Sequence, residues 1–344
     1  MSDEILFEIR GKAGFVTLNR PKALNALSHG MLKALESQLS EWADNPSVGH
    51  IVIKGAGEKA FCAGGDIRSI YDARLAGKLD GLSAFFREEY TLNAQIKAYP
   101  KPYVALIDGI VMGGGVGVSV HGSHRVGTEK TLFSMPETAI GFFPDVGGTY
   151  FLPRMPKKTG FYCALSAGRL KLGDALATGV LTHAVNSADL EDLEKALEST
   201  DDIDATLSSY QVMPEQGPLK LNEDVIEQAF SAGSVSEILE RLEASDSEFA
   251  RKTAASILHK SPTSVMIAFE QMRRGGNLSF NECMKLEYRI VSRILQGDDF
   301  FEGIRAVLVD KDQAPNWSPS HIGQVDSRDL ASYFEEPSDG DLKF

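Results

Sequence analysis

The segment from Lys101 to Gly117, KPYVALIDGIVMGGGVG, decides the fold of this chain. Its first half is a short apolar run rich in β-branched residues, which predicts a buried strand. The strand leads into the glycines Gly113, Gly114 and Gly115, which let the backbone turn sharply and let a ligand approach the N–H groups closely. A buried strand that ends in such a loop is typical of an α/β fold with ligand groups at its strand ends.

The same pattern occurs earlier in the chain. The apolar run HIVIKG begins at His50 and leads to EKAFCAGGDIR, which contains Ala63, Gly64 and Gly65. Helical spacing of apolar residues predicts helices over residues 28–45 and 81–98. One N–H group from each glycine loop would suffice to bind a single developing negative oxygen. The alternative is that each loop is only a tight strand-to-helix turn.

Acidic residues in apolar surroundings are a second feature. In MPETAIGFFPDVGGTY, residues 135–150, Glu137 and Asp145 stand among apolar residues and glycines. Carboxylates are seldom buried without a partner, so the pair either marks a candidate reaction site or lies by chance on a loop that is rich in apolar residues. Glu89 lies on the apolar face of the helix predicted over residues 81–98, whereas Glu88 is rotated about 100° away. A salt-bridged acid at the helix surface is the alternative for Glu89.

Composition excludes several classes of protein. The chain has 344 residues and a formal charge of −13, which disfavours a nucleic-acid-binding surface. No apolar run is long enough to span a membrane. The three cysteines show neither a disulfide framework nor a zinc spacing, and the start MSDEILFEIR resembles no targeting peptide. We therefore expect a soluble, cytoplasmic protein without a metal site.

Other catalytic motifs are incomplete in this sequence. The signatures of dinucleotide-binding and phosphate-binding loops are absent. The segment from Gly117 to His121 approaches the G-x-S-x-G motif around Ser119, but His121 replaces the last glycine. His121 and His124 have no further ligand at metal spacing, and Cys62 has no adjacent activating group. Packing roles are the simpler interpretation of these side chains.

Four segments together resemble the crotonase superfamily, the enoyl-CoA hydratases and isomerases. They are FVTLNRPKALNAL, KAFCAGGDI, KPYVALIDGIVMGGGVG and MPETAIGFFPDVGGTYFL. The resemblance implies an α/β fold, a spiral of ββα units followed by a helical C-terminal region, and an acyl-CoA substrate. It implies one domain over residues 5–340, with a core at about 5–186, an added helical segment at about 187–260 and C-terminal helices at about 261–325. The acid-rich runs of the added segment, such as DLEDLEKALEST, predict exposed helices and connectors there.

The resemblance also implies the roles of individual residues. The backbone N–H groups of Ala63 and Gly114 would form the oxyanion hole, and Glu137 and Asp145 would be catalytic. The residues implied to bind the acyl part of the substrate are Glu89, Gly114, Glu137 and Asp145. Those implied to lie along coenzyme A are Lys59, Ala63, Gly64, Gly65 and Asp66. No cofactor is implied, because coenzyme A is part of the substrate.

Two departures from the hydratase pattern indicate the reaction. Similar hydratases carry a second glutamate three positions after the oxyanion glycine, where this chain has Gly117. Asp145 instead occupies a position that is often glycine in them. One oxyanion hole with Glu137 and Asp145 suits acyl transfer to water better than addition across a double bond. The fuller resemblance is to family members that hydrolyse short 3-hydroxyacyl thioesters, such as those of valine breakdown.

Two rival functions remain open. A hydratase or isomerase that uses Asp145 as its second acid would add water to crotonyl-CoA without releasing a thiol. A binding protein for RNA on the same scaffold is disfavoured by the net charge of −13. The sequence does not choose between Glu137 as nucleophile and as general base, and it leaves a homo-oligomer open.

Overall fold

The computed structural model describes residues 3–78 and 81–344, and the chain divides into two compact units. Unit 1 contains Met1–Asp66, Leu92–Phe133 and Leu170–Lys220. Unit 2 contains Ile67–Thr91, Ser134–Arg169 and Leu221–Phe344. Each unit therefore combines three separate stretches of chain, and the segment expected over residues 187–260 is divided between them.

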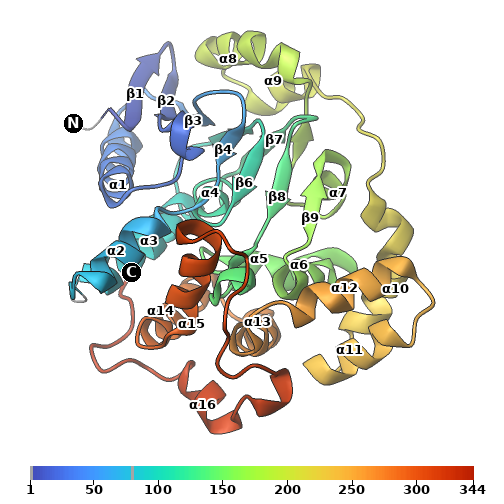
Figure 1. Ribbon diagram of the computed structural model, residues 1–344. Coiled ribbons are helices and arrows are strands. Elements are labelled where there is room, and N and C mark those ends of the chain that lie inside the picture. Colours follow the sequence, from blue (N-terminus) through green and yellow to red (C-terminus); the bar gives the residue numbers. More distant parts are fainter. Residues whose placement is uncertain (1–2, 79–80) are drawn as a thin grey trace. The chain divides into compact units, whose positions relative to one another are not determined.

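Unit 1 is built around two sheets, which confirms the predicted α/β class (Figure 1). The larger sheet has six strands in the order β1-β2-β3-β5-β7-β10, and the smaller has four in the order β4-β6-β8-β9. Within the larger sheet only β1 and β2 are antiparallel. The strands are β1 (Ile5–Arg10), β2 (Ala13–Leu18), β3 (His50–Gly55), β4 (Ala60–Cys62), β5 (Tyr103–Ile107), β6 (Ile110–Met112), β7 (His124–Gly127), β8 (Leu132–Ser134), β9 (Arg169–Lys171) and β10 (His183–Ala184).

The first helix of unit 1, α1 (His29–Asp44), follows the sequence pattern closely. The Ser28 hydroxyl accepts the Met31 N–H at 3.3 Å, so it satisfies one of the donors left free at a helix start. The apolar face with Leu35 and Trp42 is buried. The other helices of the unit are the short α4 (Gly114–Gly117) and α7 (Leu172–Ala177), α8 (Leu190–Ser199), α9 (Ile203–Ser209) and the last part of α3 (Leu82–Lys97).

Helices α8 and α9 differ from the sequence-based expectation of exposed, added elements. Leu193 and Leu197 of α8 and Leu207 of α9 are buried in a cluster with Phe15 of β2 and Val104 of β5. Of the acidic residues of α8, Glu191 and Asp192 are exposed, whereas Glu194 and Glu198 are half-buried. Burial of apolar area therefore makes these helices part of the core of unit 1.

The two glycine loops lie at one edge of the smaller sheet. Because β4 and β6 are parallel neighbours, their carboxyl ends meet at the same edge. A Cβ atom added to Gly115 would lie 2.3 Å from the Cys62 carbonyl oxygen, so only glycine fits there. The chain thus brings the loop after Cys62 against the start of α4.

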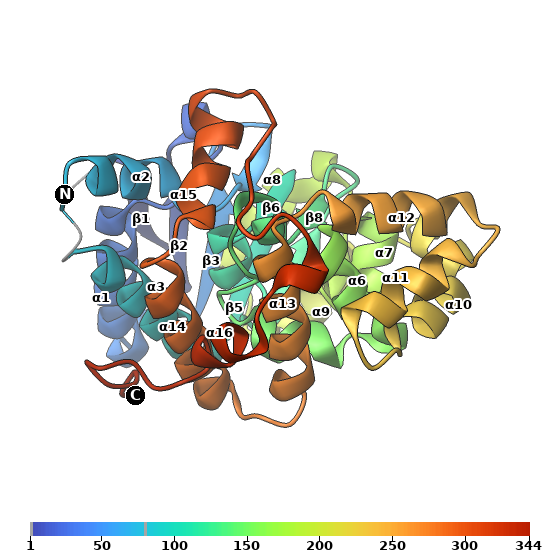
Figure 2. The same ribbon diagram turned by 60° about the horizontal axis from the view of Figure 1, so that its bottom comes forward.

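Unit 2 is mainly helical, and its α10, α11 and α12 lie side by side (Figure 2). The Ser279 side chain and Glu282 form a capping box at the start of α14. None of the helices in the described residues is long and apolar enough to cross a membrane. The helices of unit 2 are α2 (Ile67–Leu75), the first part of α3, α5 (Gly148–Phe151), α6 (Thr159–Ser166), most of α10 (Pro218–Phe230), α11 (Val235–Glu243), α12 (Glu248–Leu258), α13 (Pro262–Gly275), α14 (Phe280–Ile294), α15 (Asp299–Ile304) and α16 (Ser327–Ser332).

Candidate active site

Four carboxylates are buried within unit 2. Glu89 on α3, Glu137 at the start of a short 3-10 helix and Asp145 in the turn before α5 are 3%, 6% and 5% exposed. Glu287 on α14 is fully buried. Three of the four were predicted from the sequence, and the burial expected for them is confirmed.

Aromatic side chains account for the apolar surroundings. Phe86 of α3 stacks on Phe142 with ring centroids 5.5 Å apart, and Phe142 lies 4.5 Å from Phe300 of α15. Phe142 and Phe143 stand between Glu137 and Asp145 in the sequence. These apolar residues therefore help to exclude water from the two acids of the same stretch.

Burial raises the pKa of all four carboxyl groups. It raises the pKa of Glu89 and of Glu137 well above the ordinary value, that of Asp145 to about 7 and that of Glu287 to about 8. The negative charge of Asp145 further raises the pKa of each of the other three. The four groups cannot all be ionised near neutral pH, so protons are held within the cluster.

Tyr90 is the hydrogen-bond partner of Asp145. Its hydroxyl donates to Asp145 Oδ2 at 2.8 Å, and both side chains are buried. The bond stabilises the charged form, so it lowers the pKa of Asp145 against the effect of burial. Sequence reasoning missed Tyr90, although it directly follows the predicted Glu89.

Two carboxylate oxygens of the cluster have no protein partner. Glu89 Oε1 and Glu137 Oε2 are buried, and neither makes a hydrogen bond in the described part of the chain. Leaving a buried polar atom unpaired costs free energy, and such atoms are common where a ligand or water binds. These two oxygens therefore remain able to accept a hydrogen bond.

Glu287 was also missed by sequence reasoning. It accepts the N–H groups of Gly147 and Thr149, each at 2.9 Å. A signal was present, because Glu287 shares the apolar face of α14 with Cys283 and Ile294. The helical spacing that predicted the burial of Glu89 would also have identified Glu287.

In unit 1, the Ala63 N–H, which was predicted to belong to the oxyanion hole, has an acceptor within the fold. That group donates to the Leu24 carbonyl oxygen at 3.0 Å and is already satisfied within the fold. The N–H of Gly65 differs from that of Ala63. In the parallel bridge to Leu27, the Asp66 N–H donates to the Leu27 carbonyl and the Gly64 carbonyl accepts the Leu27 N–H, so the bridge does not use the Gly65 N–H. Within the described residues, the N–H groups of Gly65 and Gly114 have no acceptor.

The residues predicted to bind coenzyme A have different surroundings in the structure. Lys59 lines a cavity of about 400 Å³ in unit 1, together with Lys22 and Asn25. Asp66 instead forms an ion pair with Arg20 at 2.9 Å. Gly64 has a left-handed backbone with φ of +126°, which favours glycine at that position.

The side chains considered for other chemistry have structural partners in unit 1. The Ser119 hydroxyl donates to the Gly115 carbonyl at 2.7 Å, and the Cys62 thiol is buried with its Sγ 3.5 Å from the Gly64 carbonyl oxygen. His124 Nε2 lies 3.1 Å from the Asp204 carboxylate. The described residues contain no group of three or more side chains suited to hold a metal ion.

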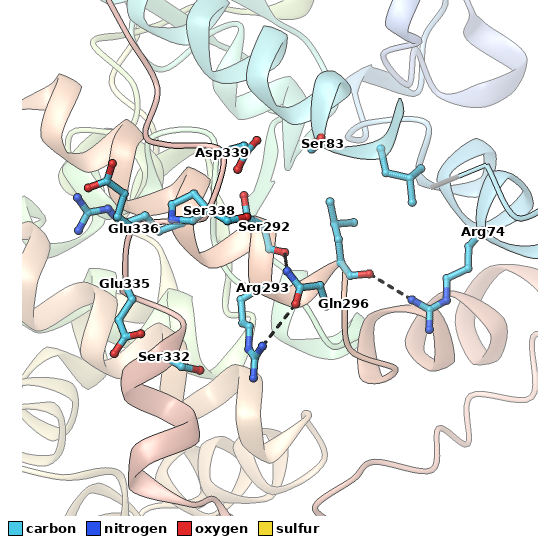
Figure 3. Close-up of a pocket in the computed structure, with 14 residues that line it drawn as sticks. Arg74, Ser83, Ser292, Arg293, Gln296, Ser332, Glu335, Glu336, Ser338 and Asp339 are labelled. Carbon is cyan, nitrogen blue, oxygen red and sulfur yellow. Dashed lines mark hydrogen bonds between the residues drawn. The ribbon is translucent and has the colours of Figure 1, made fainter. Parts of the chain in front are cut away.

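A separate cavity of about 820 Å³ opens in unit 2 and contains none of the four buried carboxylates (Figure 3). Arg293 faces it and donates to Gln296, and Arg74 donates to the Leu295 carbonyl (Figure 3). Glu335 and Asp339 of the C-terminal segment also line it. Its mixed charges and polar rim differ from the apolar surroundings of the carboxylates.

Comparison with known proteins defines the family. Residues 13–334 match the family described as enoyl-CoA hydratase/isomerase. The chain belongs to this family. It is 50% identical over 350 residues to a protein of Danio rerio named 3-hydroxyisobutyryl-CoA hydrolase, mitochondrial, with 99% of this chain and 91% of that protein covered. It is 46% identical over 353 residues to the human protein of the same name, with coverage of 100% and 91%.

Solved structures of the enoyl-CoA hydratase/isomerase family share the fold. A structure described as a carnitinyl-CoA dehydratase from Mycobacterium thermoresistibile matches with a TM-score of 0.94 and 39% identity, over 100% of this chain and 99% of that one. An enoyl-CoA hydratase from Rhodobacter sphaeroides matches with a TM-score of 0.94 and 37% identity, over 99% and 100%. The predicted crotonase fold is confirmed.

The prediction of a cytoplasmic protein is contradicted by these comparisons, because the relatives are named as mitochondrial. The prediction rested on the cysteines, on a start that resembles no targeting peptide and on the lack of an apolar run long enough to span a membrane. Cysteine usage does not distinguish one reducing compartment from another, and the other two features did not identify the compartment of the relatives.

Proposed function

We propose that this chain hydrolyses 3-hydroxyisobutyryl-CoA to the free hydroxy acid and coenzyme A. The observation that carries the proposal is 46–50% identity, over almost the whole chain, to proteins that bear the name of this activity. The buried pair Glu137 and Asp145 supports it, because thioester hydrolysis needs an acid–base group shielded from bulk water. In the position of the second hydratase glutamate the chain has Gly117, which has no side chain to act as an acid.

The proposed oxyanion hole consists of the N–H groups of Gly65 and Gly114. Both belong to loops at the same edge of the smaller sheet, and both lack an acceptor in the described residues. The carbonyl oxygen of the thioester becomes negative as the carbon is attacked, and each N–H donor stabilises that charge by about 3–4 kcal/mol. This assignment replaces Ala63 with Gly65 and keeps Gly114.

Glu137 is the proposed reactive carboxylate. In the first route it attacks the thioester carbon and expels the coenzyme A thiolate, and water then hydrolyses the resulting mixed anhydride. In the second route it removes a proton from water, which attacks the same carbon directly. Both routes consume one water and yield one carboxylic acid and one thiol. The unpaired Oε2 of Glu137 suits either role.

Asp145 and Glu89 are proposed to act on the acyl part of the substrate. Asp145 has a pKa raised to about 7, which suits a group that exchanges a proton near neutral pH. It would orient the substrate hydroxyl or the attacking water. Glu89, with its unpaired Oε1, would contact the hydroxyl end of the acyl group.

Coenzyme A is proposed to bind along unit 1. Lys22 and Lys59 line one cavity and are exposed, so their ammonium groups can meet the phosphates of the coenzyme. The Ala63–Asp66 run would follow the pantetheine arm through its backbone. The negative net charge of the chain does not oppose this, because two local lysines suffice for a small anionic ligand.

Hydration of an enoyl-CoA is the second candidate function. The observation that favours it is the likeness to solved structures described as a dehydratase and a hydratase, each with a TM-score of 0.94. In that case Asp145 would supply the second acid that Gly117 cannot. Isomerisation would require the same pair of acids.

The experiment compares two activities of one preparation. Thiol release is followed with 3-hydroxyisobutyryl-CoA, and the addition of water is followed with crotonyl-CoA. The proposal predicts rapid thiol release and slow hydration. Hydration without thiol release would show that the second candidate is correct.

Isotopically labelled water separates the two hydrolytic routes. Under single-turnover conditions, label in the Glu137 carboxylate supports the anhydride route. Label found only in the product acid supports direct attack by water. Mass spectrometry of the peptide that contains Glu137 distinguishes the two.

A further inference from the structure

The turn that carries Asp145 has an unfavourable backbone. Val146 has φ of +49° and Gly147 has φ of +89°, and the Asp145 carbonyl accepts the Gly148 N–H at 2.8 Å. A β-branched residue rarely adopts a left-handed backbone, because its Cβ atom crowds the neighbouring carbonyl. Such a conformation persists only where surrounding groups hold it.

Two side chains of the C-terminal helices hold this turn. Glu287 of α14 accepts the N–H groups of Gly147 and Thr149, one on each carboxylate oxygen. Gln271 of α13 donates from Nε2 to the Pro144 carbonyl and to Thr149 Oγ1, each at 2.6 Å. Both side chains are fully buried. The turn is therefore fixed on both sides of Asp145.

We propose that Glu287 is the positioning residue for Asp145, holding the strained turn so that the Asp145 carboxylate reaches Tyr90 and the substrate. This rests on the proposed hydrolase function. The carboxyl group suits the task, since each of its two oxygens accepts one of the two N–H bonds. A glutamine at this position can accept only one of them and places its NH₂ group against the other donor.

The position of Glu287 among other titratable groups gives a second readout. It interacts electrostatically with the carboxyl groups of Glu89, Glu137 and Asp145, the Tyr90 hydroxyl and the Cys283 thiol. Its negative charge raises the pKa of Glu89 and of Glu137. Loss of this charge should therefore lower the pKa of Glu89 and of Glu137 at pH values near and above 8, where Glu287 is ionised.

The test compares Glu287→Gln with Glu282→Gln in the full-length protein. Glu282 lies on the same helix and is exposed, and glutamine can still form the capping box there. In Glu287→Gln we expect kcat for thiol release to fall about tenfold to a hundredfold, with KM within about twofold. Glu282→Gln should match the wild type. Equal activity of the two variants would overturn the proposal.

A double-mutant cycle with Asp145→Asn tests whether Glu287 acts through Asp145. Once Asp145 is lost, Glu287→Gln should reduce kcat less than about twofold further. If the reductions in kcat caused by the two single substitutions multiply in the double variant, Glu287 has only a structural role. If Glu287→Gln does not fold, a backbone ester at Gly147 removes one of the two bonds and leaves Glu287 in place.

A crystal structure of Glu287→Gln gives a readout that does not depend on the substrate. We expect Val146 to leave the left-handed region and the Tyr90–Asp145 hydrogen bond to be lost. An unchanged turn would overturn the proposal even if activity falls. Failure of the wild type to release thiol would contradict the proposed function instead, and the crystal structure would still decide the role of Glu287.

Discussion

The candidate site residues of the two units work by different means. In unit 1 the candidate donors are backbone N–H groups at Gly65 and Gly114, in loops after parallel strands. In unit 2 the candidate groups are the side chains of Glu89, Glu137 and Asp145, buried among aromatic rings. The first group depends on the path of the main chain, and the second depends on water exclusion.

This difference determines how each region responds to change. A side-chain substitution leaves a backbone donor in place, so the oxyanion hole is altered only by moving or removing an N–H. A buried carboxylate is altered by any change in its neighbours, because burial and nearby charges decide whether it is ionised.

Replacement of single backbone N–H groups by ester oxygens should separate Gly65 from Ala63. The ester at Gly65 should lower kcat by about a hundredfold to a thousandfold with little change in the melting temperature, because it removes a donor used in the transition state. The ester at Ala63 should lower the melting temperature and leave kcat within about threefold, because it removes only the bond to Leu24. The reverse pattern would restore Ala63 to the oxyanion hole.

Tyr90→Phe should shift the pH dependence of hydrolysis. The Tyr90 hydroxyl lowers the pKa of Asp145, so its loss should raise that pKa further above its value of about 7. If Asp145 works ionised, the acid limb of kcat should move to higher pH by roughly one unit, and kcat at pH 7 should fall about fivefold. An unmoved limb would show that Asp145 does not work in its ionised form.

Asp145→Asn should change the pH dependence of stability. The pKa of Asp145 is raised to about 7 in the folded protein, above its ordinary value of 3.8, so the folded state binds the extra proton between these values. The stabilising contribution of the protonated Asp145 carboxyl group to the free energy of unfolding is therefore lost as pH rises from about 4 to 7. Relative to the wild type, we expect Asp145→Asn to gain about 5 °C in melting temperature at pH 8 and little at pH 4.

Exposed Asp246→Asn is the control for this melting experiment. It should shift the melting temperature equally at both pH values. If the difference in melting temperature between Asp145→Asn and the wild type does not change with pH, burial does not raise the pKa of Asp145.

Lys59→Ala should have the smallest effect. The cavity that Lys59 lines is open, so loss of one ammonium group should raise KM about twofold to fivefold and leave kcat unchanged. The effect should shrink at about 1 M salt, where charges are screened over a few ångströms. Lys252→Ala, which breaks only an exposed pair with Glu248, should leave KM unchanged at every salt concentration.

The comparison also explains what could be predicted from the sequence. The glycine loops and the burial of Glu89, Glu137 and Asp145 follow from local patterns, so they were found. Which N–H is free in the first loop depends on where Leu24 and Leu27 run, about forty residues earlier, and no local pattern contains that. Glu287 had a visible helical pattern, but its partners Gly147 and Thr149 lie about 140 residues away.

The added segment also illustrates this limit. Its many acids predicted exposure, yet Leu193 and Leu207 are buried. Composition averages over the faces of a helix, whereas burial depends on one face.

The most direct test of the central claim is thiol release from 3-hydroxyisobutyryl-CoA by Glu137→Gln, measured beside Glu88→Gln. Glu88 lies one residue from Glu89 but is only half-buried, so it controls for the loss of an acid. We expect Glu137→Gln to lose about a thousandfold or more in kcat with an unchanged melting temperature, and Glu88→Gln to match the wild type. Thiol release by Glu137→Gln within about tenfold of the wild type would contradict the account.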